Sequence, residues 1–278
     1  MPAPEVYGAQ PAIELLRQYL DYSGFYDRQK LFMKTVEDTV LICSGAPPGG
    51  GRNVLSQRFT RHFNILCLAK QSDKTLISIF GQILKEFLVA WSFSENIKRI
   101  AESIVEGTVE IFTRISKDLL PTPTRFHYTF NLRDISKVFQ GMLMIKPQAC
   151  NQAEDLVKLW IHENCRVFQD RLINNEDKTW FGNLIVDILL RTFKLNWKID
   201  KVIGKEKPVF GDLLKLEAPQ QPYEEIKDHS KLVKMLDAKQ EEHNLSSNQK
   251  LALVFFDDAV EHIVRICRIL KQPKGNAM

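Results

Sequence analysis

Residues 72–89 read SDKTLISIFGQILKEFLV, and this stretch decides the fold class of the chain. Its apolar residues recur at three- and four-residue steps, the spacing of one face of an α-helix. Ser72 or Asp73 stands where a helix N-cap is expected. The pattern therefore predicts an amphipathic helix whose apolar face comprises Leu76, Ile79, Phe80, Ile83 and Phe87.

The residues after this stretch continue the helical pattern. In residues 95–120 the isoleucines Ile97, Ile100, Ile104, Ile111 and Ile115 keep helical spacing, and Pro121 and Pro123 then end the helix. Three more helices are predicted in residues 132–144, 153–172 and 179–193. Residues 72–197 are thus expected to form a helical subdomain.

The residues before this stretch have a mixed character. Residues 11–20 place Ile13, Leu16 and Leu20 on one helical face, whereas residues 38–44 and 64–69 are apolar runs typical of short buried strands. Two strands alone do not make a doubly wound sheet. Residues 1–71 are therefore expected to be part of an incomplete α/β unit, in a chain that is predominantly helical.

The C-terminal third begins with a segment of low periodicity. Residues 198–222 are rich in Lys, Gly and Pro and predict a connector. Residues 223–278 follow it, with a solvated helix expected in 223–244 and an amphipathic helix in 249–270.

Composition excludes several classes of protein. The chain has 278 residues, 44% of them hydrophobic, and its formal charge of +4 comes from interspersed residues, which gives little support to nucleic-acid binding. No apolar run approaches the roughly 18–20 residues that span a bilayer, and the N-terminus lacks the order of a secretory signal, so an intracellular protein is expected. Five cysteines without a C-x-x-C pair indicate reduced thiols.

Two stretches imitate nucleotide-binding motifs. Residues 45–53, GAPPGGGRN, supply the glycines of a phosphate loop, but Gly51 and Arg52 stand where Lys and Ser/Thr are required, so we reject a Walker A motif. Residues 251–258, LALVFFDD, imitate a Walker B strand. Helical spacing continues through Asp257 and Asp258, which favours placing both acids on a helix surface.

No metal site is predicted. His162 and Glu163 begin an H-E-x-x-H pattern, but Arg166 occupies the position of the second His, so we expect a surface or packing pair. The other five histidines also lack a partner at ligand spacing.

Two groups of basic residues are candidates for binding phosphate. Arg58, Arg61 and His62 precede an expected strand and could meet an anion or form a solvated basic turn. Arg133 opens a helix and could face an anion. From the residues alone, pairing of Arg133 with Asp134 or another acid is favoured.

Several stretches together resemble one family. They are residues 1–18 (MPAPEVYGAQPAIELLRQ), 46–53 (APPGGGRN), 58–65 (RFTRHFNI), 119–143 (LLPTPTRFHYTFNLRDISKVFQGML), 162–172 (HENCRVFQDRL) and 255–278 (FFDDAVEHIVRICRILKQPKGNAM). In this order they resemble the third AAA+ module of axonemal-type dynein heavy chains. The resemblance covers essentially the whole chain and implies a partial AAA+ module, α/β plus α: an incomplete αβα subdomain (1–71), a helical lid (72–197), a connector (198–222) and the opening helices of the fourth module (223–278).

The resemblance also implies roles for three residues. Arg61 matches the arginine finger, which acts on the nucleotide of the preceding module. Arg133 matches sensor 2, which reaches the nucleotide of its own module. Ala46 occupies the sensor 1 position, where related cytoplasmic dyneins have Asn, which implies a degenerate, regulatory site.

The function implied by the resemblance is a part of an ATP-driven, minus-end-directed microtubule motor of the axoneme in cilia and flagella. Its cofactors would be ATP or ADP with magnesium in the intact heavy chain, and its partners the neighbouring AAA+ modules, dynein intermediate and light chains, and microtubules, with no nucleic acid and no membrane. The chain carries neither Walker motif and resembles a segment cut between two of them, so we expect it neither to bind nucleotide nor to hydrolyse ATP alone. The alternative is a non-catalytic protein that binds axonemal or dynein subunits through its helical lid.

Overall fold

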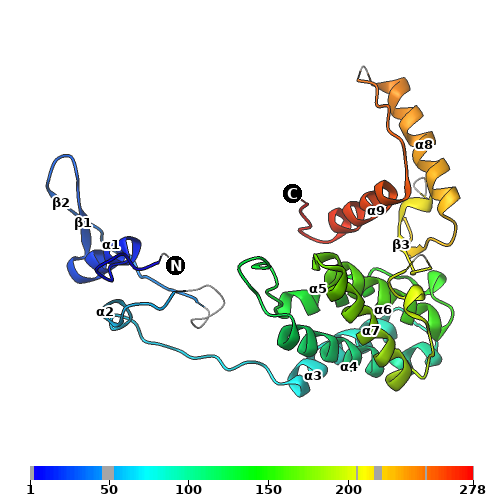
Figure 1. Ribbon diagram of the computed structural model, residues 1–278, viewed down its shortest axis with the longest axis horizontal. Helices are drawn as coiled ribbons and strands as arrows, with labels where there is room; N and C mark the ends of the chain where they lie inside the picture. The colour runs from blue at the N-terminus through cyan, green and yellow to red at the C-terminus, as the bar shows by residue number, and fades with distance from the viewer. Residues whose placement is uncertain (1–2, 46–52, 205, 216–220, 248, 278) are drawn as a thin grey trace. The chain divides into compact units, whose positions relative to one another are not determined.

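The computed structural model describes residues 3–45, 53–204, 206–215, 221–247 and 249–277, and the chain divides into two units. Unit 1 comprises Met1–Lys70 and Leu120–His127, and unit 2 comprises Gln71–Leu119 and Tyr128–Met278. Figure 1 colours both units from the N-terminus to the C-terminus. Helices dominate the described residues, as the sequence predicts.

Unit 2 opens with two helices that pack on each other, α3 (Asp73–Ala90) and α4 (Glu95–Asp118). Ser72 caps α3 as expected, because its side chain accepts a hydrogen bond of 3.2 Å from the Thr75 amide. The predicted face of α4 is confirmed, with four of its five isoleucines fully buried: Ile97, Ile104, Ile111 and Ile115.

The predicted face of α3 is partly wrong. Leu76 and Phe80 are buried as expected, but Ile79 and Ile83 are 46% and 43% exposed. Leu84 and Leu88 take their place in the core. Positions 76, 80, 84 and 88 form an unbroken four-residue stripe, and this stripe packs against the core that α4 shares.

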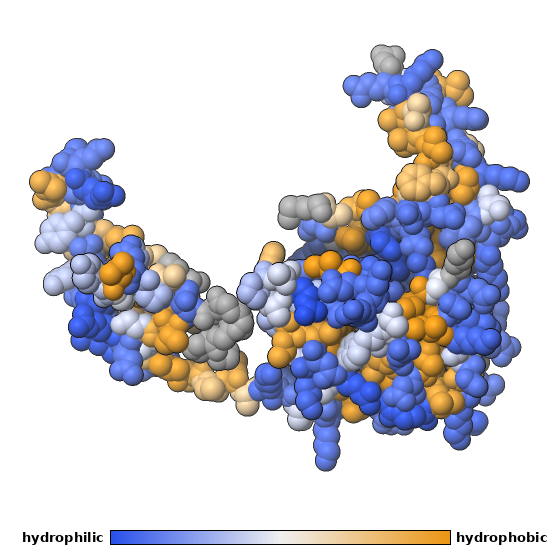
Figure 2. Space-filling view, viewed as in Figure 1, coloured by the Kyte–Doolittle hydropathy of each residue, from blue (hydrophilic) through white to orange (hydrophobic). Residues whose placement is uncertain are grey.

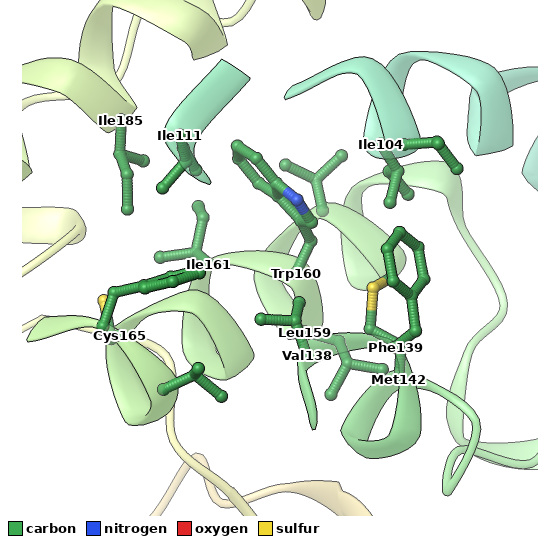
Figure 3. Close-up of a cluster of buried hydrophobic side chains, with 14 of the residues drawn as sticks. Ile104, Ile111, Val138, Phe139, Met142, Leu159, Trp160, Ile161, Cys165 and Ile185 are labelled. Carbon is green, nitrogen blue, oxygen red and sulfur yellow. The ribbon is translucent and has the colours of Figure 1, made fainter. Parts of the chain in front are cut away.

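The core of unit 2 gathers around α6 (Ala153–Val167), which α4, α5 (Leu132–Met142) and short η2 (Gln169–Arg171) contact. Helix α7 (Asn175–Thr192) packs on α4 and adds Ile185 to this core. Figure 3 shows Trp160 of α6 among Ile104, Ile111 and Leu159. Trp160 is fully buried, and its indole nitrogen donates a 2.8 Å hydrogen bond to the Thr108 hydroxyl. The polar atom of the largest core side chain is therefore satisfied.

Residues 198–222 are more ordered than a connector of low periodicity suggests. They contain two short 3-10 helices, η3 (Ile199–Lys201) and η4 (Leu213–Lys215), and β3 (Phe210–Gly211). Strand β3 pairs antiparallel with β4 (Glu224–Glu225). Val202 and Phe210 are buried in the main core of unit 2. A further 3-10 turn, η1 (Pro147–Ala149), leads from α5 toward α6.

The last two helices are α8 (His229–Ser246) and α9 (Asp257–Lys271). Helix α8 is mostly exposed, as predicted. Among its described residues, Leu232 alone is fully buried. Helix α9 begins later than predicted, because residues 251–256 have no regular structure and are mostly exposed. Asp257 and Asp258 lie in the first turn of α9, where negative charge is favourable.

Unit 1 holds helix α1 (Pro11–Tyr22), a hairpin of β1 (Gly24–Tyr26) and β2 (Met33–Thr35), and short α2 (Gln57–Thr60). The predicted helix at residues 11–20 is confirmed. Among the described residues of unit 1, the buried hydrophobic side chains are Ile13 on α1 and Phe59 on α2. The hairpin turns at Asp27, whose carboxylate accepts hydrogen bonds of 2.9 Å from the Gln29 and Lys30 amides.

The two buried strands predicted in unit 1 are wrong. Residues 38–44 and 64–69 form no regular structure, and most of their apolar side chains are exposed, including Val40, Ile42 and Leu68 at 86–91%. A strand needs a neighbouring strand to pair its backbone N–H and C=O groups. Among the described residues, no strand pairs with these segments. Figure 2 shows hydrophobic side chains in orange on the surface of unit 1.

Candidate functional site

The first turn of α5 is built around a reciprocal capping box. The Arg133 amide donates a 2.9 Å hydrogen bond to the Asn131 side chain, and the Asn131 amide donates one of 2.9 Å to the Asp134 carboxylate. Each side chain thus satisfies a backbone donor that a helix start would leave without a partner. The start of this helix is fixed at the residue beside Arg133.

Asp134 does not pair with Arg133, although the sequence favours that pairing. Its carboxylate is buried and lies 2.9 Å from a terminal nitrogen of the Arg171 guanidinium. The Arg133 side chain is exposed and makes no hydrogen bond or ion pair with any other residue that the structure describes. Arg133 therefore presents a free cationic group at the surface of unit 2.

Arg61 follows the short helix α2 of unit 1. Its guanidinium lies 3.1 Å from the Asp21 carboxylate, and its side chain is 63% exposed. His62 lies on the same carboxylate, also at 3.1 Å. The structure thus joins two of the three predicted basic residues through an acid on α1, while Arg58 is exposed on α2. An exposed pair of this kind contributes about 1 kcal/mol at most, so Arg61 can exchange Asp21 for another anion.

Ala46, the degenerate sensor 1 position, lies outside the described residues, as does most of the glycine-rich loop. Arg61 belongs to unit 1 and Arg133 to unit 2, and each is therefore described within its own unit.

A buried charged cluster in unit 2 is absent from the sequence predictions. Glu163 of α6 is fully buried, and its carboxylate accepts hydrogen bonds from the Tyr223 hydroxyl at 2.7 Å and from Nε of Arg268 at 3.0 Å. Arg268 of α9 is 7% exposed. The carboxylate raises the pKa of Arg268 despite its burial. Gly141 of α5 makes room for this group, because a Cβ there would overlap the Glu163 carboxylate.

His162 and Glu163 are therefore a packing pair rather than a surface pair. The His162 ring packs on Phe210 with 5.7 Å between centroids, and Nδ1 lies 3.1 Å from the Pro208 carbonyl oxygen, to which it donates. Burial, followed by the charges of Arg166 and Arg268, holds the pKa of His162 well below its usual value. The residue is neutral and serves the core.

A signal for this cluster is present in the sequence. Glu163 stands four residues after Leu159 and four before Val167, so a helix places it on the same face as these two apolar residues, and both of them are buried. A charged residue in the middle of an apolar helix face is expected to be buried and to need a charged or polar partner.

Two further groups of residues bear on chemistry. Within the described residues, His, Cys, Asp and Glu form no group of three or more that could hold a metal ion. Cys150 and Cys165 are buried thiols, and burial raises the pKa of each to about 12, so neither is a reactive thiolate.

Among the residues that the structure describes, no helix combines the length and the apolarity needed to cross a membrane.

Each unit therefore offers one surface arginine as a candidate anion-binding residue, Arg61 in unit 1 and Arg133 in unit 2. A guanidinium binds phosphate oxygens through a planar fork of donors, so both can bind an anionic ligand.

Three family descriptions match the sequence. Residues 1–71 match "P-loop containing dynein motor region", residues 104–201 match "AAA+ lid domain", and residues 251–278 match "P-loop containing dynein motor region D4". The lid match covers α5, α6 and α7 and most of α4. Residues 104–201 are thus an AAA+ lid, and the fold is a partial AAA+ module.

Similar proteins extend over the whole chain. Dynein axonemal heavy chain 6 of Homo sapiens is 45% identical over 281 residues, and dynein axonemal heavy chain 1 of Homo sapiens is 42% identical over 291 residues. Dynein axonemal heavy chain 12 of Mus musculus is 40% identical over 291 residues. Each alignment covers 100% of this chain, whereas this chain spans only 7–9% of the length of these curated relatives. With its dynein motor regions, its AAA+ lid and this identity along its full length, the chain belongs to the axonemal dynein heavy chain family.

Proposed function

We propose that the chain serves as part of the AAA+ ring of an ATP-driven, minus-end-directed microtubule motor of cilia and flagella. It would supply the distal α/β part of the third module (1–71), its lid (72–197), a connector (198–222) and the opening helices of the fourth module (223–278). The observation that carries the proposal is the free guanidinium of Arg133 at the start of lid helix α5.

Arg133 fits the role of sensor 2. Its one neighbouring acid, Asp134, is already engaged by Asn131 and Arg171. The Arg133 side chain is consequently exposed and available to an anion. In the intact ring, Arg133 would bind a phosphate of the nucleotide in its own module. The lid helix α5 would then respond to whether nucleotide is present.

Arg61 fits the role of an arginine finger toward the preceding module. It follows α2, is 63% exposed, and is held by a surface ion pair with Asp21 that a phosphate can replace. Bound nucleotide would supply the phosphates that these arginines recognise and the hydrolysis that drives the motor. The Ala46 assignment, a regulatory third site, remains part of the proposal and rests on sequence.

Arg61 and Arg133 are cationic and suit the phosphates of a nucleotide. The sequence carries neither a Walker A nor a Walker B motif. We therefore expect the purified chain to show no ATP turnover, and measurable turnover would contradict this. Neighbouring modules, dynein intermediate and light chains and microtubules are the proposed partners, and the axoneme is the proposed location.

The proposal is tested in an intact heavy chain that carries this segment. Arg133→Ala should weaken nucleotide binding by this module at least about tenfold, since a hydrogen bond to a charged group contributes about 1.5–3 kcal/mol. Arg61→Ala should instead slow hydrolysis by the preceding module and leave binding by this module unchanged. Arg114→Ala, which removes a surface arginine paired with Glu110 on α4, is the matched control. Equal, unaltered ATPase and microtubule gliding in all three variants would refute both roles.

A further inference from the structure

One arginine outside the proposed site holds three parts of the turn that leads into α5. The Arg171 guanidinium lies 2.9 Å from the Asp134 carboxylate and donates a 2.9 Å hydrogen bond to the Thr129 carbonyl oxygen. It also lies over the Phe130 ring, 4.8 Å from the centroid. These contacts engage residues on both sides of the Asn131 cap.

The same turn is anchored at its other end. Tyr128 is buried, and its hydroxyl donates a 2.9 Å hydrogen bond to the Asp177 carboxylate of α7 and accepts one of 3.0 Å from the Ile173 amide. The turn is therefore fixed to the body of the lid through Tyr128, and to the end of η2 through Arg171. The backbone that carries Arg133 has little freedom to move.

Arg171 also alters the charge beside Arg133. Asp134 is the next residue, and an unpaired carboxylate there would attract the Arg133 guanidinium and repel a phosphate. The ion pair with Arg171 neutralises this carboxylate and leaves it buried. Because Asp134 is buried and the Arg171 side chain is 28% exposed, salt screens their interaction less than that of a fully exposed pair.

We propose that Arg171 is a positioning residue for Arg133: it fixes the turn that begins α5 and neutralises Asp134, which keeps the Arg133 guanidinium free for a nucleotide phosphate. This inference rests on the proposed sensor role of Arg133. Arg171 touches no phosphate itself, and it acts through the residues it contacts.

The test is local hydrogen exchange in an intact heavy chain that carries this segment, with and without adenylyl imidodiphosphate and magnesium. The probe is the nucleotide-dependent protection of peptides covering residues 131–138. In the unsubstituted chain we expect protection, and Arg133→Ala should raise the half-maximal nucleotide concentration about tenfold. Arg171→Ala should raise it by a factor of about three to ten, and Arg171→Lys, which keeps the charge but not the fork, by less.

A second substitution separates the effect on charge from an effect on folding. Asp134→Asn keeps an oxygen that can accept the Asn131 amide but removes the charge, so it should restore most of the nucleotide affinity that Arg171→Ala loses. A merely structural role predicts no such rescue. It predicts instead that Arg171→Ala raises exchange of residues 131–138 equally with and without nucleotide, and that result would overturn the inference.

The remaining outcomes distinguish this inference from the proposed function. If Arg133→Ala weakens the protection and Arg171→Ala does not, the sensor role stands and the role of Arg171 is refuted. If the unsubstituted chain shows no nucleotide-dependent protection here, or if Arg133→Ala leaves it unchanged, the sensor role fails and the inference fails with it.

Discussion

Unit 1 and unit 2 differ in how their apolar residues are used. In unit 2, one core joins helices from α3 to α7 and extends to Phe210 and Tyr223. In unit 1, Ile13 and Phe59 are the buried hydrophobic residues of the described range, and whole apolar segments face solvent. The difference teaches that a helix satisfies its own backbone, whereas an apolar strand requires a partner strand.

The two units can be followed separately in solution. All four tryptophans of the chain, Trp91, Trp160, Trp180 and Trp197, belong to unit 2. Tryptophan fluorescence therefore reports unit 2, and local hydrogen exchange in α1 and α2 reports unit 1. Each prediction below asks whether a change stays within the unit in which it is made.

The largest effect is expected from Trp160→Ala in the core of unit 2. Trp160 is fully buried and donates its hydrogen bond to Thr108, so truncation leaves a cavity and a hydroxyl that loses a partner. We expect the free energy of unfolding of unit 2 to fall by about 3–5 kcal/mol. Urea unfolding followed by circular dichroism at the helix band measures it.

The matched change in unit 1 is Phe59→Ala, since Phe59 is also a buried aromatic residue. We expect it to raise hydrogen exchange in α1 and α2 without shifting the fluorescence transition of unit 2. A shift of that transition would show that the two units do not unfold independently.

The next effect is expected from Arg268→Met, which tests how α9 is held by the lid. The change leaves the fully buried Glu163 carboxylate without its cationic partner. We expect a loss of about 3 kcal/mol, because one half of a buried ion pair remains unpaired. Adding Glu163→Gln should recover most of this loss, and urea unfolding by fluorescence measures both variants.

Arg191→Met is the control for this pair. Arg191 bridges Glu110 and Asp187 on the surface of unit 2 and is 47% exposed. We expect its loss to change the free energy of unfolding by about 1 kcal/mol at most. If Arg191→Met and Arg268→Met lower the free energy of unfolding equally, burial of the Glu163–Arg268 pair does not make its disruption more costly.

A smaller effect is expected from pH through His162. Burial and the charges of Arg166 and Arg268 hold its pKa well below the usual value of 6.5 in the folded chain. The unfolded chain takes up a proton near pH 6.5 and the folded chain does not, so stability is fully present above this pH and is lost as pH falls. We expect unit 2 to lose about 1.4 kcal/mol per pH unit between pH 6 and pH 5 from this residue.

Two histidine variants, one on α6 and one on α9, test this pH dependence. Urea unfolding by fluorescence at pH 7.5, 6 and 5 should give a flatter profile for His162→Gln than for the unsubstituted chain. His262→Gln, which changes an exposed histidine on α9, should leave the profile unaltered. If both variants keep the original slope, other groups account for the acid sensitivity.

The sequence predicts most of unit 2 because its helices carry their own signals. The isoleucines of α4 have a single consistent spacing, and the structure buries them accordingly. On α3 two apolar stripes overlap, and only packing against α4 decides that Leu84 and Leu88 are buried instead of Ile79 and Ile83. Local spacing thus predicts the helix but not the face.

Other features depend on contacts between distant residues. Glu163 and Arg268 are 105 positions apart, so no spacing rule links them. The strands expected at residues 38–44 and 64–69 have the right composition but no partner among the described residues. The sequence does contain a signal for the hairpin of β1 and β2. Asp27 is a typical turn residue, and its carboxylate accepts hydrogen bonds from the backbone amides of Gln29 and Lys30.

The smallest effect is expected from Asp21→Ala in unit 1, and it tests whether surface charge holds this unit together. The change removes the ion pairs of Asp21 with Arg61 and His62, and also its 3.6 Å pair with Arg17 within α1. Because such exposed pairs contribute about 1 kcal/mol at most, exchange rates of the α1 amides should rise by no more than about fivefold. Glu14→Ala, which removes an ion pair with Arg17 within α1, is the control. A far larger increase for Asp21→Ala alone would mean that this acid, rather than Ile13 and Phe59, fixes α2 to α1, and unit 1 would then differ from unit 2 in the kind of interaction that stabilises it.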